Sequence, residues 1–144
     1  MKTPNRNLRQ VNNKRRRLDI TISRGHATTQ YLFYAILNTD LRMNIGVAAE
    51  NIANALLILY NQLDTDTVKY QYVDIWAKSG RRITILKGYD HKHLKYLENE
   101  LQFMALGTHA LRQIWGRNRA IVVLAVFGQK EDMDEIFEGL SYLR

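Results

Sequence analysis

Nearly continuous apolar runs mark two segments of the chain, residues 31–38 (YLFYAILN) and residues 119–128 (RAIVVLAVFG). Such runs are typical of strands that are covered on both faces of a sheet. Residues 81–88 (RRITILKG) and, more weakly, residues 108–115 (THALRQIW) have the composition of further strands. The sequence GRN, which lies between residues 108–115 and residues 119–128, predicts a turn. The pattern therefore predicts four short strands.

Apolar residues at helical spacing predict the elements between these strands. Residues 44–63 keep their polar side chains on a narrow side, and Asn44 is suited to be the N-cap, which predicts a largely buried helix. Residues 90–107 predict a second helix, because leucines recur at helical spacing along it. Asp90 is expected to cap this helix and Gly107 to stop it.

Residues 131–143 predict a third helix, with one apolar face and with carboxylates in the first turn, where the helix dipole favours them. Residues 70–76 alternate, but both of their faces are half apolar, so this segment remains unassigned or weakly helical. The order strand, helix, strand, helix, strand, strand, helix predicts a three-layer α/β/α domain with a small mixed four-stranded sheet over residues 25–144.

Positive charge is concentrated in residues 1–24, a basic N-terminal extension. The chain has 21 Lys plus Arg and 14 Asp plus Glu, and the extension holds eight of the basic residues against Asp19 alone. Thirteen residues of each sign remain, so the rest of the chain is formally neutral. The eight cations of the extension are Lys2, Arg6, Arg9, Lys14, Arg15, Arg16, Arg17 and Arg24. We expect them to bind RNA, since each cation that neutralises a phosphate releases a counterion. A solubilising or targeting segment is the alternative.

Composition limits the remaining classes of function. The chain of 144 residues fits one domain and has no apolar run long enough to span a bilayer, so we expect a soluble intracellular protein. It has no cysteine, which excludes a disulfide framework and thiolate catalysis. Its four histidines lack metal-binding spacing, since His91 and His93 point in different directions on a helix. We expect neither a metal nor a cofactor.

Other candidate groups have simpler explanations. Two arginine pairs at strand ends, together with Arg42, are secondary candidates for anion contacts, although such residues are usually just solvated. These arginines are Arg42, Arg81, Arg82, Arg117 and Arg119. Gly46 at a helix start is compatible with an anion site, but close packing of a helix on a strand explains it equally well. Tyr70, Tyr72 and Trp76 are suited to stack on bases, but packing in the core or on a partner is the better explanation.

The segment 38–57 (NTDLRMNIGVAAENIANALL) resembles the type 2 peptidyl-tRNA hydrolase family, in which a Thr-Asp-Leu-Lys-Met loop leads into the first helix. Arg42 stands for the lysine of this loop, and the other matching positions are Thr39, Asp40, Leu41, Met43, Gly46, Ala49 and Ala55. The order of elements also agrees, so the resemblance covers about residues 31–143. It implies the fold of that family.

The departures from the family pattern concern its chemistry. The lysine at the helix start falls on Val47 and the helix histidine falls on Asn54. A valine cannot donate a charge-assisted hydrogen bond, and an asparagine cannot exchange a proton near neutral pH. The later Asp-Ala-Gly-Arg-Thr-Gln loop of the family corresponds at best to residues 114–119 (IWGRNR), which lack the aspartate and in which Arg117 can keep the arginine. The resemblance thus implies the fold without the hydrolase activity.

We therefore expect a non-catalytic protein that binds structured RNA, with ribosomal RNA and neighbouring ribosomal proteins as partners, in mitochondria or the cytoplasm. No membrane and no small-molecule substrate is expected to bind. The first alternative is a divergent but active peptidyl-tRNA hydrolase that uses Asp40, Arg42 and Arg117. The second is a free-standing protein-interaction domain with a targeting segment.

Overall fold

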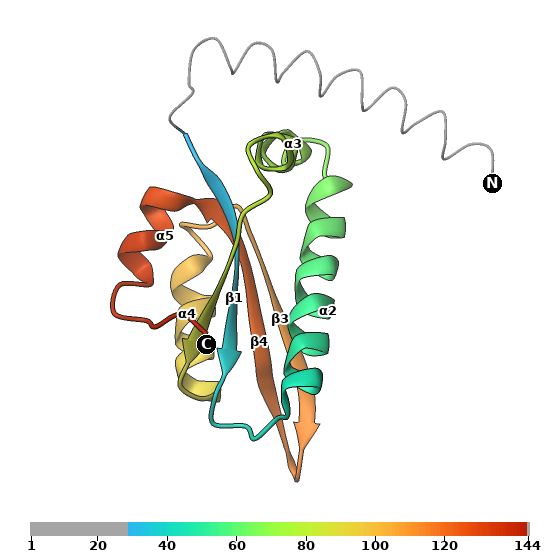
Figure 1. Cartoon of the computed structure of the whole chain (residues 1–144), viewed down its shortest axis with the longest axis vertical. Helices are drawn as coiled ribbons and strands as arrows, with labels where there is room; N and C mark the ends of the chain where they lie inside the picture. Colours follow the sequence, from blue (N-terminus) through green and yellow to red (C-terminus); the bar gives the residue numbers. More distant parts are fainter. Residues whose placement is uncertain (1–28, 144) are drawn as a thin grey trace, which may run out of the picture.

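A four-stranded mixed sheet forms the middle layer of the computed structural model, which describes residues 29–143 (Figure 1). The strands are β1 (Tyr31–Asn38), β2 (Ile83–Gly88), β3 (Gly107–Trp115) and β4 (Asn118–Gln129). Their order across the sheet is β2-β1-β4-β3. β1 and β2 are parallel, whereas β4 is antiparallel to both β1 and β3. The predicted mixed sheet of four strands is confirmed.

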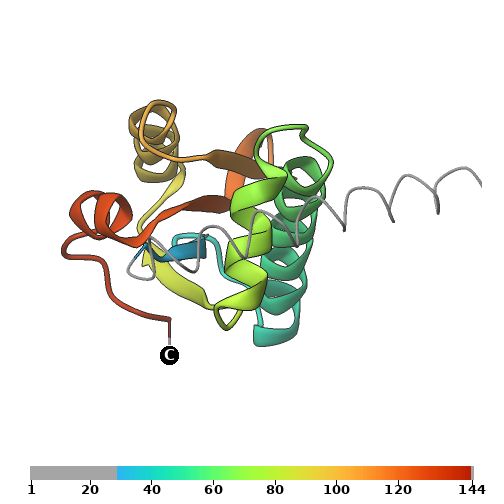
Figure 2. The same cartoon turned by 90° about the horizontal axis from the view of Figure 1, so that it is seen from above.

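Two pairs of helices cover the two faces of this sheet, as the view from above shows (Figure 2). One face carries α2 (Ile45–Asp64) and α3 (Tyr70–Lys78), and the other carries α4 (His91–Leu101) and α5 (Lys130–Ile136). The three-layer α/β/α arrangement is therefore confirmed. The ambiguous segment near residue 70 is a helix, because Val73 and Trp76 lie one turn apart and are both buried against the sheet.

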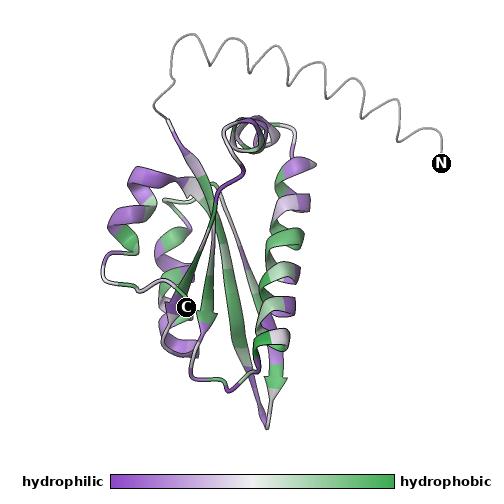
Figure 3. Ribbon diagram, in the orientation of Figure 1, coloured by the Kyte–Doolittle hydropathy of each residue, from purple (hydrophilic) through white to green (hydrophobic). Residues whose placement is uncertain are grey.

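The central strands are apolar on both faces because both faces are covered. Every residue of β1 is buried, and its side chains point alternately to the two helical layers. Phe33 packs against Phe127 of β4 in the layer of α2, whereas Ile36 belongs to the core beneath α4 and α5. The hydropathy colouring shows the apolar residues gathered along the central strands (Figure 3).

β4 contains a bulge near its start. Leu111 of β3 pairs with Val123, but the next residue, Arg112, pairs with Ile121. Val122 is therefore an extra residue in β4, and both Val122 and Val123 belong to the core on the α2 side. The pairing of β1 with β4 ends at Leu37 and Val123, directly beside this bulge.

The predicted end of the helix at residues 90–107 was wrong. α4 is capped by Asp90 as predicted, since the carboxylate accepts a hydrogen bond from the backbone N–H of His93, but the helix ends at Leu101 and not at Gly107. Gly107 instead begins β3, where a β-carbon would come within 2.8 Å of the side chain of Leu63. A larger residue at this position would displace the side chain of Leu63, because α2 lies close to β3.

The C-terminal helix is also shorter than predicted, because α5 ends at Ile136. The chain then turns at Gly139, whose φ is +87°, and runs along the outer edge of β2. The backbone N–H of Lys87 donates to the carbonyl of Ser141 at 2.9 Å, and Leu143 donates to the carbonyl of Ile85 at 3.0 Å. Part of the exposed edge of the sheet is covered in this way.

Candidate functional site

Three segments meet at one end of the molecule, which we call the loop end. They are the β1–α2 loop (residues 39–44), the β2–α4 loop with the first turn of α4 (residues 89–93), and the β3–β4 hairpin (residues 114–119) (Figure 1). The carboxyl ends of the parallel strands β1 and β2 point to this end. In open α/β sheets, ligands bind outside the carboxyl ends of the strands.

Hydrogen bonds join the first two of these segments. The hydroxyl of Thr39 donates to the carbonyl of Gly88 at 2.6 Å, and the backbone N–H of Asp40 donates to the carbonyl of Tyr89 at 3.0 Å. The same N–H also lies 3.0 Å from Oδ1 of the buried Asn38. The matching residues Thr39 and Asp40 therefore fix the loop geometry, and the side chain of Asp40 remains exposed.

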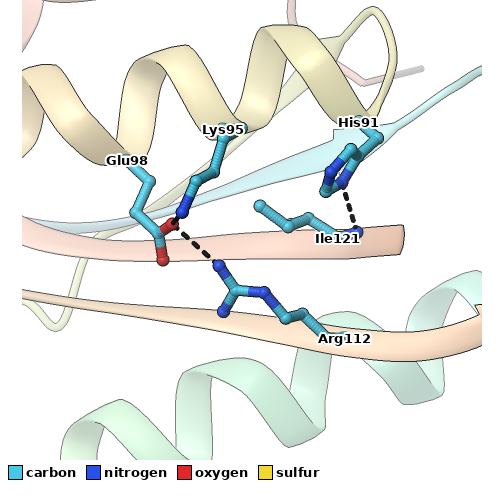
Figure 4. A network of polar contacts seen from close by, with 5 residues as sticks. All are labelled: His91, Lys95, Glu98, Arg112 and Ile121. Atoms are coloured by element: carbon cyan, nitrogen blue, oxygen red, sulfur yellow. Dashed lines mark hydrogen bonds and ion pairs between the residues drawn. The ribbon is translucent and has the colours of Figure 1, made fainter. Parts of the chain in front are cut away.

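Two side chains satisfy the backbone of Ile121 where the bulge interrupts the sheet. Nδ2 of Asn38 donates to the carbonyl of Ile121 at 2.9 Å. The N–H of Ile121 donates to Nδ1 of His91 at 3.0 Å (Figure 4). Buried backbone groups need such partners. Sequence reasoning missed both Asn38 and His91, although an asparagine at the end of a fully apolar strand was a usable signal.

α2 begins as its sequence predicts but is less buried than predicted, since Ile45 is 90% exposed and Leu57 is 63% exposed, whereas the polar Asn51 is buried. Oδ1 of Asn44 accepts a hydrogen bond from the N–H of Val47 at 2.9 Å, which confirms the predicted N-cap. Farther along the helix, the buried Asn51 accepts a hydrogen bond at 2.9 Å from the side-chain amide of Gln113 on β3. Val47 is 39% exposed and Asn54 is exposed, so the two positions where the family carries lysine and histidine both reach solvent.

A small charged network joins α4 to β3. The carboxylate of Glu98 lies 2.8 Å from the guanidinium of Arg112 and 3.1 Å from the ammonium group of Lys95 (Figure 4). Burial lowers the pKa of His109 on β3, Arg112 lowers it further, and Glu98 opposes this change. These contacts hold α4 against the edge of the sheet.

The first turn of α4 carries a second perturbed histidine. Nδ1 of His93 accepts a hydrogen bond from the N–H of Tyr89 at 3.0 Å, and the two rings lie 4.4 Å apart. Burial lowers the pKa of His93, and the negative charge of Asp90 partly opposes this. Burial and the hydrogen bond from the N–H of Tyr89 both favour the neutral imidazole as a structural acceptor.

The predicted secondary cations fall at opposite ends of the molecule. Arg42, Arg117 and Arg119 are exposed at the loop end, where residues 116 and 117 form the predicted turn and Gly116 has a φ of +65°. Arg81 and Arg82 are exposed at the other end, where β2 begins beside the start of β1. The eight cations of residues 1–24 lie outside the described residues.

Packing in the core explains Tyr72 and Trp76, but close packing does not explain Gly46. Trp76 packs edge-on against Phe33, with ring centroids 4.6 Å apart, and its indole N–H donates to the carbonyl of Arg82 at 2.8 Å. Tyr72 packs against Tyr31. Gly46 is exposed, and a β-carbon there would meet only Oδ1 of Asn44, at 3.4 Å, so close packing on a strand does not explain this glycine.

Within residues 29–143, no group of three or more potential metal ligands occurs. No helix among the same residues is long and apolar enough to cross a membrane.

Comparison with known proteins agrees with the family that the sequence resembles. No curated protein sequence matches the chain significantly. The family model of peptidyl-tRNA hydrolase PTH2 matches residues 31–143, from the first residue of β1 to the segment that pairs with β2. This chain therefore belongs to the PTH2 family of peptidyl-tRNA hydrolases.

Proposed function

We propose that this protein is a non-catalytic member of the PTH2 family that binds structured RNA, as a component of a mitochondrial or cytoplasmic ribosome. The observation that carries this proposal is the pair Val47 and Asn54 on α2. At these positions the family pattern has lysine and histidine, and neither replacement can supply a positive charge or transfer a proton near neutral pH.

The hairpin at residues 114–119 supports the loss of activity. It is the best counterpart of the family loop that begins with aspartate, and it contains no carboxylate. Arg117 keeps a cation there, but an arginine alone cannot act as a general base, because it stays protonated at every relevant pH. Three features of the family's site are thus changed together, two of them on α2 and the third in the distant β3–β4 hairpin.

The charge distribution supports RNA as the partner. The extension places eight cations within residues 1–24 of a chain that is otherwise neutral. At the loop end, Arg42, Lys92, Arg117 and Arg119 are exposed beside the N-termini of α2 and α4. Helix N-termini favour anions, so this end offers phosphate groups a second contact surface. The extension supplies most of the affinity, and the loop end orients the domain on the RNA.

A ribosome fits these properties best, because it presents structured RNA and protein surfaces side by side. The domain would then contact neighbouring ribosomal proteins, while the extension contacts ribosomal RNA. The test is sedimentation of the native protein with ribosomal subunits in a sucrose gradient after a high-salt wash. The proposal predicts that the protein stays with one subunit. Recovery of all the protein at the top of the gradient, even at low salt, would contradict it.

A further inference from the structure

An apolar groove runs along α2 on the side that faces β2. Its lower part, about 580 Å³ in volume, is lined only by apolar side chains, among them Ile45, Ala49, Ala53 and Ile85. Its upper part reaches Trp76 at the end of α3. The two parts share Leu56, Leu57 and Ile83, so the groove is continuous.

The groove exists because β2 has no helix of its own on this face. α2 packs over β1, β4 and β3, which leaves Ile83 of β2 50% exposed and Leu57 of α2 63% exposed. Alanines on α2 leave room for larger side chains from outside. Contiguous apolar surfaces of this kind are rarely left uncovered in a protein and mark a contact site.

We propose that residues 18–22 of the same chain occupy this groove. Their sequence, LDITI, places Leu18, Ile20 and Ile22 on one side of an extended segment and Asp19 and Thr21 on the other. This is the densest apolar part of residues 1–28.

The dimensions allow this contact. Ile22 precedes Tyr31 by nine residues, which can span up to about 30 Å. The start of β1 lies beside the upper part of the groove, because Phe33 both lines the groove and pairs with Ile83. An extended segment of five residues is about 16 Å long, close to the roughly 18 Å of α2 between Ile45 and Leu57.

Tethering favours this occupant over a separate molecule. A segment joined to its site by a short linker has an effective concentration in the millimolar range, well above that of a second copy in dilute solution. The open edge of β2 adds to the fit, because it offers backbone hydrogen-bonding groups at Ile83. Backbone groups alternate in direction along β2, so the N–H and C=O of Ile83 point outward from the sheet, as do those of Ile85 and Lys87. This inference goes beyond the proposed function, since the contact does not depend on RNA.

The absence of cysteine makes disulfide trapping a direct test. The full-length double variant Ile20→Cys/Leu57→Cys is oxidised at low micromolar concentration, and the product is analysed by mass spectrometry. The control is Ile20→Cys/Tyr96→Cys, because Tyr96 is similarly exposed but lies on α4, across the sheet. We expect an intramolecular disulfide to form at least tenfold faster in the first variant than in the control.

Two results would overturn the proposal. One is an equal rate of disulfide formation in the two variants. The other is a disulfide-linked dimer whose yield rises with protein concentration, which would assign the groove to a second copy. An independent measurement is the alkylation rate of the single variant Leu57→Cys, which should rise about tenfold when Leu18, Ile20 and Ile22 are replaced by serine. An unchanged alkylation rate would also contradict the contact.

Discussion

Nδ1 of His91 accepts a 3.0 Å hydrogen bond from the backbone N–H of Ile121, across 30 positions of the sequence. This bond gives the N–H of Ile121 a partner beyond the point where the pairing of β1 with β4 ends, and it joins the first turn of α4 to β4. The loop end is therefore fixed by side chains from two elements, His91 from α4 and Asn38 from β1.

Replacing His91 should destabilise the domain. His91→Ala leaves the N–H of Ile121 without its partner, and an unsatisfied buried group costs about 1–3 kcal/mol. The free energy of unfolding, measured by urea denaturation, should fall by that amount. Lys92→Ala, at the exposed next position, is the control and should change it by less than about 0.5 kcal/mol. Equal effects of the two substitutions would show that the hydrogen bond is not important.

The two asparagines of α2 should differ in the same assay. Asn51 is 5% exposed and accepts a hydrogen bond from Gln113, so Asn51→Ala should cost about 1–3 kcal/mol in the free energy of unfolding. Asn54→Ala, three residues farther along the exposed side, should cost less than about 0.5 kcal/mol. A large loss at Asn54 would mean that this position has a structural role that its exposure hides.

Stability should decrease below neutral pH because of two histidines. The pKa values of His93 and His109 are lowered from the ordinary 6.5 in the folded protein, mainly by burial. The unfolded chain therefore takes up protons first as the pH falls through 6.5, and the free energy of unfolding decreases until the folded histidines also titrate.

This pH dependence can be isolated by substitution. In the double variant His93→Gln/His109→Gln, the free energy of unfolding should change less between about pH 7.5 and 5.5, where carboxylates stay ionised. Lys92→Gln is the matched control and should keep the slope of the original chain. An identical slope in the double variant would assign the pH dependence to other groups.

Peptidyl-tRNA should not be hydrolysed above background by the purified protein, because Val47 and Asn54 lack the required chemistry. Release of the peptide from labelled peptidyl-tRNA measures this. The variant Val47→Lys/Asn54→His should also stay inactive, since the hairpin at residues 114–119 has no carboxylate. Hydrolysis by the original chain that disappears on Asp40→Ala or Arg117→Ala would instead establish a divergent active enzyme.

Local signals in the sequence predicted the fold well. The unbroken apolar runs predicted β1 and β4 within two residues of their ends, since short runs of this kind are typical of strands covered on both faces. The N-caps Asn44 and Asp90 were predicted correctly, because capping depends on a few adjacent residues. The helix ends were predicted less well, since Gly107 lies at the start of β3, close to α2, and not at a helix terminus.

The candidate site was only partly predictable. The loop that carries Thr39 and Asp40 was found by its resemblance to the family, and the family match covers it. The roles of Asn38 and His91 depend on the position of Ile121, which lies beyond the end of the β1–β4 pairing and far from both residues in the sequence. Contacts between distant residues of this kind require the folded structure.

The most direct test of the central claim is a salt titration of binding to purified ribosomal RNA. It compares the full-length protein with the triple variant Arg15→Glu/Arg16→Glu/Arg17→Glu and with a chain that lacks residues 1–24. If most of the eight cations contact phosphates, the logarithm of affinity should fall with the logarithm of salt concentration with a slope of about four to seven in magnitude. Both altered proteins should lose most of the affinity and most of the slope. Equal affinity and equal slope in all three proteins would contradict the claim that the extension anchors this domain to RNA.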